Sequence, residues 1–167
     1  IWTATDPSLD YALINPFAFE PAAAPHLAAS RAGRSIRFEE IVRAFEALGE
    51  PGCRVIVEGV GGWRVPLGED GDLSDLAAAL GLPVILVVGL RLGCINHALL
   101  TAESIKHRGL DLVGWVANAV DPAMALRSDN VRTLENRIDA PCLGLVPFTE
   151  NPDGQSVAAR LDIGPLL

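Results

Sequence analysis

Lysine and paired cysteines are scarce in this sequence of 167 residues, and their scarcity excludes several classes of protein. Cys53, Cys94 and Cys142 are odd in number, lie far apart and form no C-x-x-C pair, so neither a disulfide framework nor a zinc site is predicted. A net charge of -8 and a pI near 4.8 argue against nucleic-acid binding, because neutralising phosphates requires clustered Lys and Arg. We therefore expect small-molecule ligands and a reduced, cytoplasmic environment.

The sequence also lacks a long hydrophobic run and a leader segment. Its longest apolar run, Leu82 to Leu90, contains Pro83 and Gly89 and falls well short of the roughly 20 residues that a membrane-spanning helix needs. The first residues, IWTATDPSLDY, include no initiating Met, no basic segment and no apolar segment. We expect no membrane association, and a chain that begins inside a longer protein.

Short apolar runs alternate with amphipathic segments, and 50% hydrophobic residues suffice for a sizeable core. The pattern predicts strands at 54–57, 83–88, 110–117 and 142–146. It predicts helices at 38–48, 73–80, 95–108 and 125–138, with Gly49, Gly81 and Gly109 as C-terminal caps and a loop at 21–25. This order predicts a single α/β domain, a doubly wound and mostly parallel sheet with helices on both faces.

Ligands of such sheets bind beyond the carboxyl ends of the strands, and Glu58 stands at the first of these ends. A strand-terminal carboxylate followed by glycines is typical of Mg²⁺ sites beside nucleotide phosphates, although a capping or salt-bridged Glu is an equal interpretation. Gly61 and Gly62 permit close backbone approach to an anion, or else form a plain tight turn.

Two further strand ends carry candidate binding groups. Gly93 and Cys94 precede a helix whose first amides can receive a carboxylate or phosphate, with Asn96 in the first turn. Asn118 ends the next strand, and its amide can pair with the edge of adenine. Each residue also has a purely local explanation, as a first-turn residue or a strand terminator.

A nucleotide site of this kind needs the phosphate loop G-x-x-x-x-G-K-[ST], which this sequence does not contain. Its one lysine, Lys106, stands late in a predicted helix, where a cation favours the helix C-terminus, and cannot serve as the P-loop lysine. Either the nucleotide interpretation is wrong or the phosphate loop lies upstream of Ile1.

Several segments, in this order and spacing, resemble the dethiobiotin synthetase family of biotin biosynthesis. They are DYALINPFAFEP with APH, VEGVGGWRVPL, LPVILVVGLRLGCINHALLTAESI, LVGWVAN and GLVPFTENP. The resemblance spans nearly the whole chain. It implies a homodimeric P-loop enzyme that uses ATP and Mg²⁺ to form dethiobiotin from 7,8-diaminopelargonate and CO₂.

The resemblance also implies that the family's phosphate loop, second strand and further catalytic lysine precede these residues. The sequence would then be the C-terminal two-thirds of one P-loop-type domain (1–167), inactive by itself, and no catalytic residue is assigned within it. A cobyrinate amide-forming synthetase shares the VEG-x-G signature and remains an alternative, as does a noncatalytic nucleotide-binding or dimerisation module.

By the family's pattern, the residues already singled out take specific roles. Glu58 would bind Mg²⁺, Gly61 would approach the substrate, and Asn118 with Pro147 would hold adenine. The diamino acid would contact Leu86, Gly93, Cys94, Ile95 and Asn96 of the partner subunit. Asp153 stands near the position where the family often has a glutamate that contacts the ribose, although the segment PFTENPD is one residue shorter than in common versions of the family. Arg91 occupies a place where Lys is frequent, and either cation would attract an anionic substrate.

Overall fold

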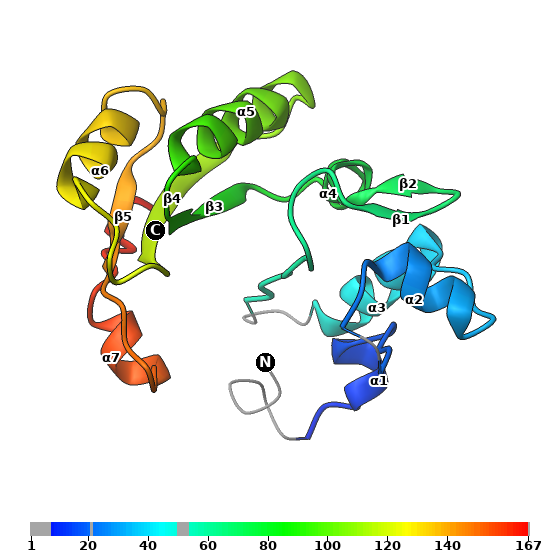
Figure 1. The fold of residues 1–167 in the computed structure, drawn as a ribbon. Coiled ribbons are helices and arrows are strands. Elements are labelled where there is room, and N and C mark those ends of the chain that lie inside the picture. The colour runs from blue at the N-terminus through cyan, green and yellow to red at the C-terminus, as the bar shows by residue number, and fades with distance from the viewer. Residues whose placement is uncertain (1–7, 21, 50–53, 167) are drawn as a thin grey trace. The chain divides into compact units, whose positions relative to one another are not determined.

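The computed structural model describes residues 8–20, 22–49 and 54–166, which divide into two compact units, 1–81 and 82–167 (Figure 1). The first unit begins with the helices α1 (Tyr11–Ile14), α2 (Pro25–Arg31) and α3 (Phe38–Leu48). A short antiparallel pair, β1 (Pro66–Gly68) and β2 (Gly71–Asp72), leads into α4 (Leu73–Leu80). The core of this unit is a cluster of Ala29, Ile36, Leu67 and Leu76.

The start of α4 is fixed by a capping box. The Asp72 carboxylate accepts hydrogen bonds from the backbone N–H groups of Ser74 and Asp75, at 2.8 and 3.2 Å, and the Asp75 carboxylate accepts one from the Asp72 N–H at 2.9 Å. Arg64 forms an ion pair with Asp72 from the preceding loop. At the C-terminal end Gly81 takes a left-handed conformation, with φ of 62°. Helix α4 is therefore capped at both ends.

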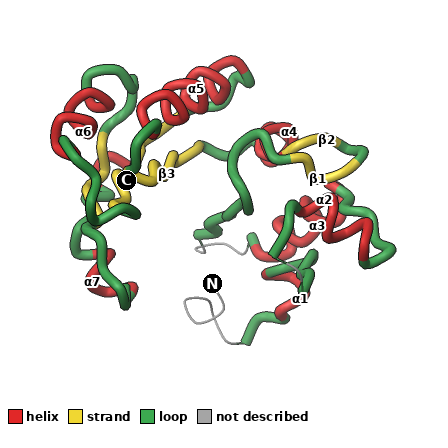
Figure 2. The backbone as a smooth tube through the Cα atoms, in the orientation of Figure 1, coloured by secondary structure: helices red, strands yellow, loops and turns green. Residues whose placement is uncertain are grey.

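The second unit is built around a parallel sheet in the order β3-β4-β5, labelled in Figure 1, and its strands are yellow in Figure 2. Its strands are β3 (Val84–Leu90), β4 (Leu112–Ala119) and β5 (Cys142–Val146), connected through α5 (Cys94–His107) and α6 (Arg127–Glu135). The short helix α7 (Gly154–Ala158) and the 3-10 helix Gly164–Leu166 follow β5. Parallel strands joined by crossover helices confirm the predicted α/β class.

Helices α5 and α6 lie side by side in Figure 1 and cover one face of this sheet. Trp115 and Ala117 of β4 are fully buried there, together with Leu90 of β3 and Leu134 of α6. Because side chains alternate along a strand, Val116 and Asn118 point to the opposite face. On that face a Cβ added to Gly144 would stand 2.1 Å from the carbonyl oxygen of Arg160, so the C-terminal segment passes directly over this glycine.

Most element predictions are confirmed. Helices α3 and α4 and strand β5 have the predicted bounds, and β3, β4, α5 and α6 differ by a few residues at their ends. Gly81 and Gly109 are left-handed as expected for caps, whereas Gly49 caps α3 with φ of -79°. The sequence patterns missed α2, which begins at Pro25, the last residue of the predicted loop.

The strand predicted at 54–57 is wrong, because those residues belong to no strand in the structure. Ile56 is 93% exposed and Val57 is 42% exposed. A β-branched run gains stability as a strand only by pairing with a neighbour, and no described strand pairs with this segment. None of the described helices is long and apolar enough to cross a bilayer.

Protonation of Asp72 should weaken the first unit. Burial raises the pKa of Asp72, but hydrogen bonds from the Ser74 hydroxyl, Arg64 and the backbone of Asp75 and Ser74 outweigh it and lower the pKa from 3.8 to about 2. A depressed folded-state pKa stabilises the fold above the unfolded value, and this stabilisation is lost as the pH falls from about 3.8 through about 2.

We therefore expect Asp72→Asn to lower the free energy of unfolding at pH 7 by roughly 1 to 2 kcal/mol, with the difference from wild type shrinking toward pH 2. Urea unfolding followed by circular dichroism across this pH range measures both effects. The exposed Glu69, replaced by Gln, is the matched control. A difference that stays constant down to pH 2 would contradict the capping role.

Candidate functional site

The carboxyl ends of the three parallel strands gather most of the predicted binding residues in the second unit. Asn118 of β4 is in register with Gly89 of β3 on one side and Val146 of β5 on the other. Pro147 directly follows Val146 and is exposed. The structure therefore brings Asn118 and Pro147 together at one edge of the sheet, where ligands of α/β proteins bind.

The Asn118 side chain is available to a ligand. It is partly buried, lies on the face opposite Trp115 and Ala117, and forms no hydrogen bond with any described residue. A carboxamide carries both a donor and an acceptor, so a partly buried one normally has a partner. This arrangement suits recognition of a planar base edge that offers the complementary pair of groups.

The loop at the amino end of α5 presents backbone N–H groups. Gly93 is the N-cap, with φ of 93°, and a Cβ added there would meet no atom within 4 Å, so its requirement for glycine is conformational. The Cys94 N–H donates to the Arg91 carbonyl at 3.0 Å. The N–H groups of Ile95 and Asn96 have no partner among the described residues, which leaves two donors at the positive end of the helix dipole.

The side chains that were predicted to share a substrate site differ in their burial. Cys94 is buried in the core cluster, so only its backbone lies at the helix start. Leu86 packs against the same cluster from the middle of β3, and Ile95 is partly buried against it. Asn96 and Arg91 are exposed. Core packing therefore accounts for Leu86 and Cys94, and their predicted contacts with a substrate stay predictions.

Asp153 has a structural partner that the sequence did not reveal. It is the N-cap of α7, and its carboxylate accepts hydrogen bonds from the N–H groups of Gln155 and Ser156, at 3.1 and 2.9 Å. Hydrogen bonding to the side chain and backbone of Ser156 lowers the pKa of Asp153. A ribose contact would have to share this carboxylate with the helix cap, and it stays a prediction.

Glu58 and Gly61 lie in the first unit, in the segment between α3 and β1. Glu58 is exposed and forms no ion pair or hydrogen bond with the described residues. Gly61 and Gly62 have φ of 84° and 111°, which favours glycine at both positions. A Cβ on Gly59 would stand 2.2 Å from a methyl carbon of Leu73, so a larger residue there would require the Leu73 side chain to move.

The segment around Glu58 offers a metal ion one exposed carboxylate and no complete set of protein ligands among the described residues. Within the described ranges, no group of three or more His, Cys, Asp or Glu side chains could hold a metal ion. Mg²⁺ normally keeps several waters and takes one or two protein carboxylates together with substrate phosphates. The single exposed carboxylate of Glu58 is compatible with that kind of coordination, and its role as a Mg²⁺ ligand stays a prediction.

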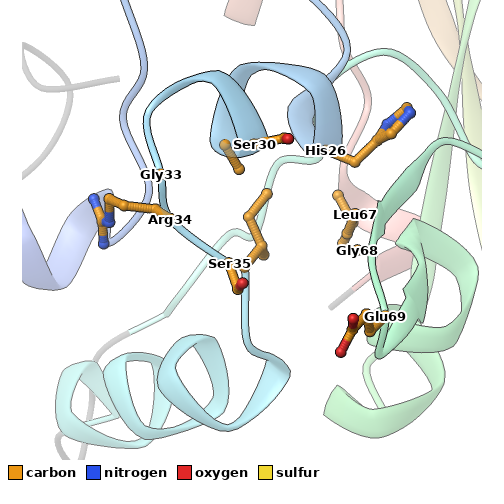
Figure 3. A pocket seen from close by; sticks show the side chains of 10 residues that line it. His26, Ser30, Gly33, Arg34, Ser35, Leu67, Gly68 and Glu69 are labelled. Carbon is orange, nitrogen blue, oxygen red and sulfur yellow. The ribbon is translucent and has the colours of Figure 1, made fainter.

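The first unit also contains a cavity of about 290 Å³ between α2 and β1 (Figure 3). Figure 3 shows His26 and Arg34 on opposite sides of it. The His26 Nδ1 atom lies 3.1 Å from the Pro66 carbonyl oxygen, and the Arg34 guanidinium stacks on Phe17, 5.0 Å from the ring centroid. Both polar groups are engaged in holding this unit together, and none of the predicted site residues lines the cavity.

One residue near the strand ends escaped the sequence patterns. Arg127, the first residue of α6, donates hydrogen bonds from Nη2 to the carbonyl oxygens of Asp121 and Pro122, at 3.0 and 2.9 Å. These carbonyls belong to the loop that follows Asn118. The only signal in the sequence is that this arginine stands near the start of a predicted helix. A positive charge is unfavourable there because the N-terminus of a helix is the positive end of its dipole, so another interaction must stabilise the arginine.

Comparisons with known proteins place the chain in a family. A family model described as an AAA domain matches residues 2–156. The chain is 55% identical to the ATP-dependent dethiobiotin synthetase BioD of Pseudomonas paraeruginosa PA7 over 162 residues, covering 95% of this chain and 70% of the relative. It is 54% identical to the enzyme of that name from Aromatoleum aromaticum EbN1, covering 93% of this chain and 68% of the relative. The identity is 52% for the Ralstonia nicotianae GMI1000 protein of the same name, at 95% and 69% coverage.

The left-handed backbone at Gly93 gives a testable requirement. Gly93→Ala should lower the free energy of unfolding by roughly 1 to 2 kcal/mol, because a Cβ is strained at a φ of 93° even where space is open. Gly154→Ala is the matched control, since that glycine also has open space but no positive φ, and it should change stability by less than about 0.5 kcal/mol. Equal losses in urea unfolding would contradict the conformational requirement.

Proposed function

This chain belongs to the dethiobiotin synthetase family, and we propose that the full-length protein is an ATP- and Mg²⁺-dependent cyclo-ligase of biotin biosynthesis. The reaction joins CO₂ to 7,8-diaminopelargonate as a carbamate, phosphorylates the carbamate from ATP, and closes the ureido ring of dethiobiotin with release of ADP and phosphate. Identity of 55% along 95% of the chain supports the assignment.

The observation that carries this proposal is the free amide of Asn118 at the carboxyl edge of a parallel sheet. Adenine offers an exocyclic amine and a ring nitrogen, and a carboxamide pairs with both at once. Pro147, which follows the neighbouring strand, supplies an exposed apolar wall and a backbone beside this amide. Asn118 and Pro147 would therefore bind the base, and Asp153 would lie toward the ribose.

The free amides at the start of α5 suit the carboxylate of the diamino acid. Two unpartnered N–H groups, from Ile95 and Asn96, combine hydrogen-bond donors with the positive end of the helix dipole. Exposed Arg91 adds positive charge nearby in the sequence. We propose that these groups serve the partner subunit of a homodimer, as in the family's pattern, so that substrate binding and dimerisation strengthen each other.

Glu58 would hold the Mg²⁺ ion, and Gly61 would bring its backbone close to the substrate. The ion, when bound, neutralises charge on the nucleotide phosphates. The exposed carboxylate of Glu58 has no described partner to displace, so binding the ion requires no ion pair to break. The left-handed Gly61 lies three residues further on, where it exposes backbone groups without a side chain.

The phosphate-binding lysine has no candidate among these 167 residues. Lys106, the single lysine, stands in the last turn of α5, where its charge favours the helix C-terminus. We therefore expect the 167 residues alone to be catalytically inactive, and the activity to require the full-length protein.

The three cysteines without disulfide spacing support a cytoplasmic location.

Turnover by the full-length protein tests the function directly. We expect dethiobiotin and ADP to form only when diaminopelargonate, CO₂, ATP and Mg²⁺ are all present, measured by mass spectrometry of the product. A noncatalytic nucleotide-binding module would bind ATP and form no dethiobiotin. A requirement for glutamine would instead indicate an amide-forming synthetase.

The carboxylate site makes a separate prediction. The methyl ester of diaminopelargonate should bind about tenfold more weakly than the free acid, because the helix amides favour a charged carboxylate by roughly 1 to 2 kcal/mol. Competition against the free acid in the turnover assay measures this ratio. An ester that competes as well as the acid would remove the start of α5 from the substrate site.

The base site is tested by Asn118→Ala in the full-length protein. We expect a KM for ATP raised by at least about tenfold and a loss of discrimination against GTP, since the base edge loses its partner. Asn136→Ala, an exposed asparagine at the end of α6, is the control and should leave both quantities unchanged. An unchanged preference for ATP over GTP in Asn118→Ala would refute the adenine assignment.

A further inference from the structure

The loop between β4 and α6 leaves the sheet two residues after Asn118 and contains several hydrogen bonds. The Asp121 carboxylate accepts a hydrogen bond from the Ala123 N–H at 2.9 Å, and the Met124 N–H donates to the Asp121 carbonyl at 3.3 Å. Leu126, the last residue of the loop, has φ of 51°, a left-handed conformation that is unfavourable for a leucine. A strained residue persists only where its surroundings hold it.

Arg127, the residue after Leu126, forms the hydrogen bonds that stabilise this conformation. One nitrogen of Arg127, Nη2, donates to two consecutive carbonyl oxygens, those of Asp121 and Pro122. No carboxylate of the described ranges lies within ion-pair distance of Arg127, and its Nε is buried with no described partner. The guanidinium therefore forms its hydrogen bonds with the loop backbone rather than with an acidic side chain.

A second arginine on the same helix shows the contrast. Arg132 forms an ion pair with Asp129, three residues earlier on α6, and both side chains are about half exposed or more, at 67% and 49%. Such a pair on one surface of a helix contributes little to the position of any other element. Arg127 instead ties the start of α6 to the residues that emerge from β4.

The other end of the loop lies beside β3. A Cβ added to Gly89 would stand 3.4 Å from a methyl carbon of Val120, an ordinary van der Waals distance, so the Val120 side chain lies next to this glycine although it is 45% exposed. Gly89 is also the register partner of Asn118. The hydrogen bonds of Arg127 are therefore the strongest contacts that join this loop to the rest of the unit.

We propose that Arg127 is a positioning residue for nucleotide recognition: its guanidinium holds the loop after Asn118 so that the Asn118 amide is oriented toward the adenine edge. This inference rests on the proposed function, because it gives Arg127 a role only through Asn118. A bound base gains most from a partner whose orientation is fixed before binding. A planar guanidinium that bridges two carbonyls provides such fixing, whereas an ammonium group at the end of a flexible stem provides less.

The test compares nucleotide selectivity in the full-length enzyme. Arg127→Ala should raise the KM for ATP by roughly five- to fiftyfold and erode the preference over GTP, while the KM for diaminopelargonate changes by less than about twofold. Arg127→Lys should fall between wild type and Arg127→Ala. Arg132→Ala is the matched control on the same helix and should leave all three values unchanged.

A double-mutant cycle separates positioning from general stabilisation. If Arg127 acts through Asn118, adding Arg127→Ala to Asn118→Ala should cause no further loss of ATP selectivity. If Arg127→Ala lowers the melting temperature but keeps selectivity, while Asn118→Ala loses it, Arg127 is merely structural and the proposed base site stands. If Asn118→Ala itself keeps selectivity, the base site is wrong and the role of Arg127 falls with it. Should Arg127→Ala fail to fold, Arg127→Lys decides between these outcomes by the same measurements.

Discussion

The parallel register of β3, β4 and β5 is the constraint on which the second unit depends. It aligns Gly89, Asn118 and Val146 at one height, so that three loops from distant parts of the sequence begin side by side. Trp115 and Ala117, fully buried beneath α5 and α6, fix which way β4 faces. Because successive residues of a strand alternate between faces, this burial also fixes Asn118 on the other face. A slip of one residue would bury its amide in the core.

The sequence predicted the elements of the second unit well because their signals are local. The apolar run PVILVV predicted a strand, and glycines marked the ends of helices. The same run also predicted burial on both faces, whereas Ile85 and Val87 are 45% and 60% exposed in the structure. The same reasoning placed Asn118 and Pro147 at one edge of the sheet, because all parallel strands end on the same side. Their position could therefore be predicted from the order of the elements alone.

The prediction failed where the outcome depends on partners that a local pattern does not contain. Residues 54–57 have strong strand preference, yet they form no strand, since β propensity reflects pairing and packing more than the backbone itself. The roles of Cys94 and Asp153 were also invisible in sequence, because a buried thiol and a helix cap are defined by what surrounds them. Arg127 was missed for the same reason: its partners are backbone carbonyls, which carry no sequence signature.

The contact between Gly144 and the segment after α7 bears on how freely this sequence can vary. The atom that a new side chain would strike is a backbone oxygen of Arg160, which cannot swing aside as the end of a flexible side chain would. Any other residue would have to displace the main chain around Arg160, which is tied to β5 by a hydrogen bond of 2.7 Å from the Asp162 N–H to the Leu143 carbonyl. In a mutagenesis library of this chain, position 144 should therefore strongly favour glycine, because the backbone of residues 160–162 lies against β5 at this point.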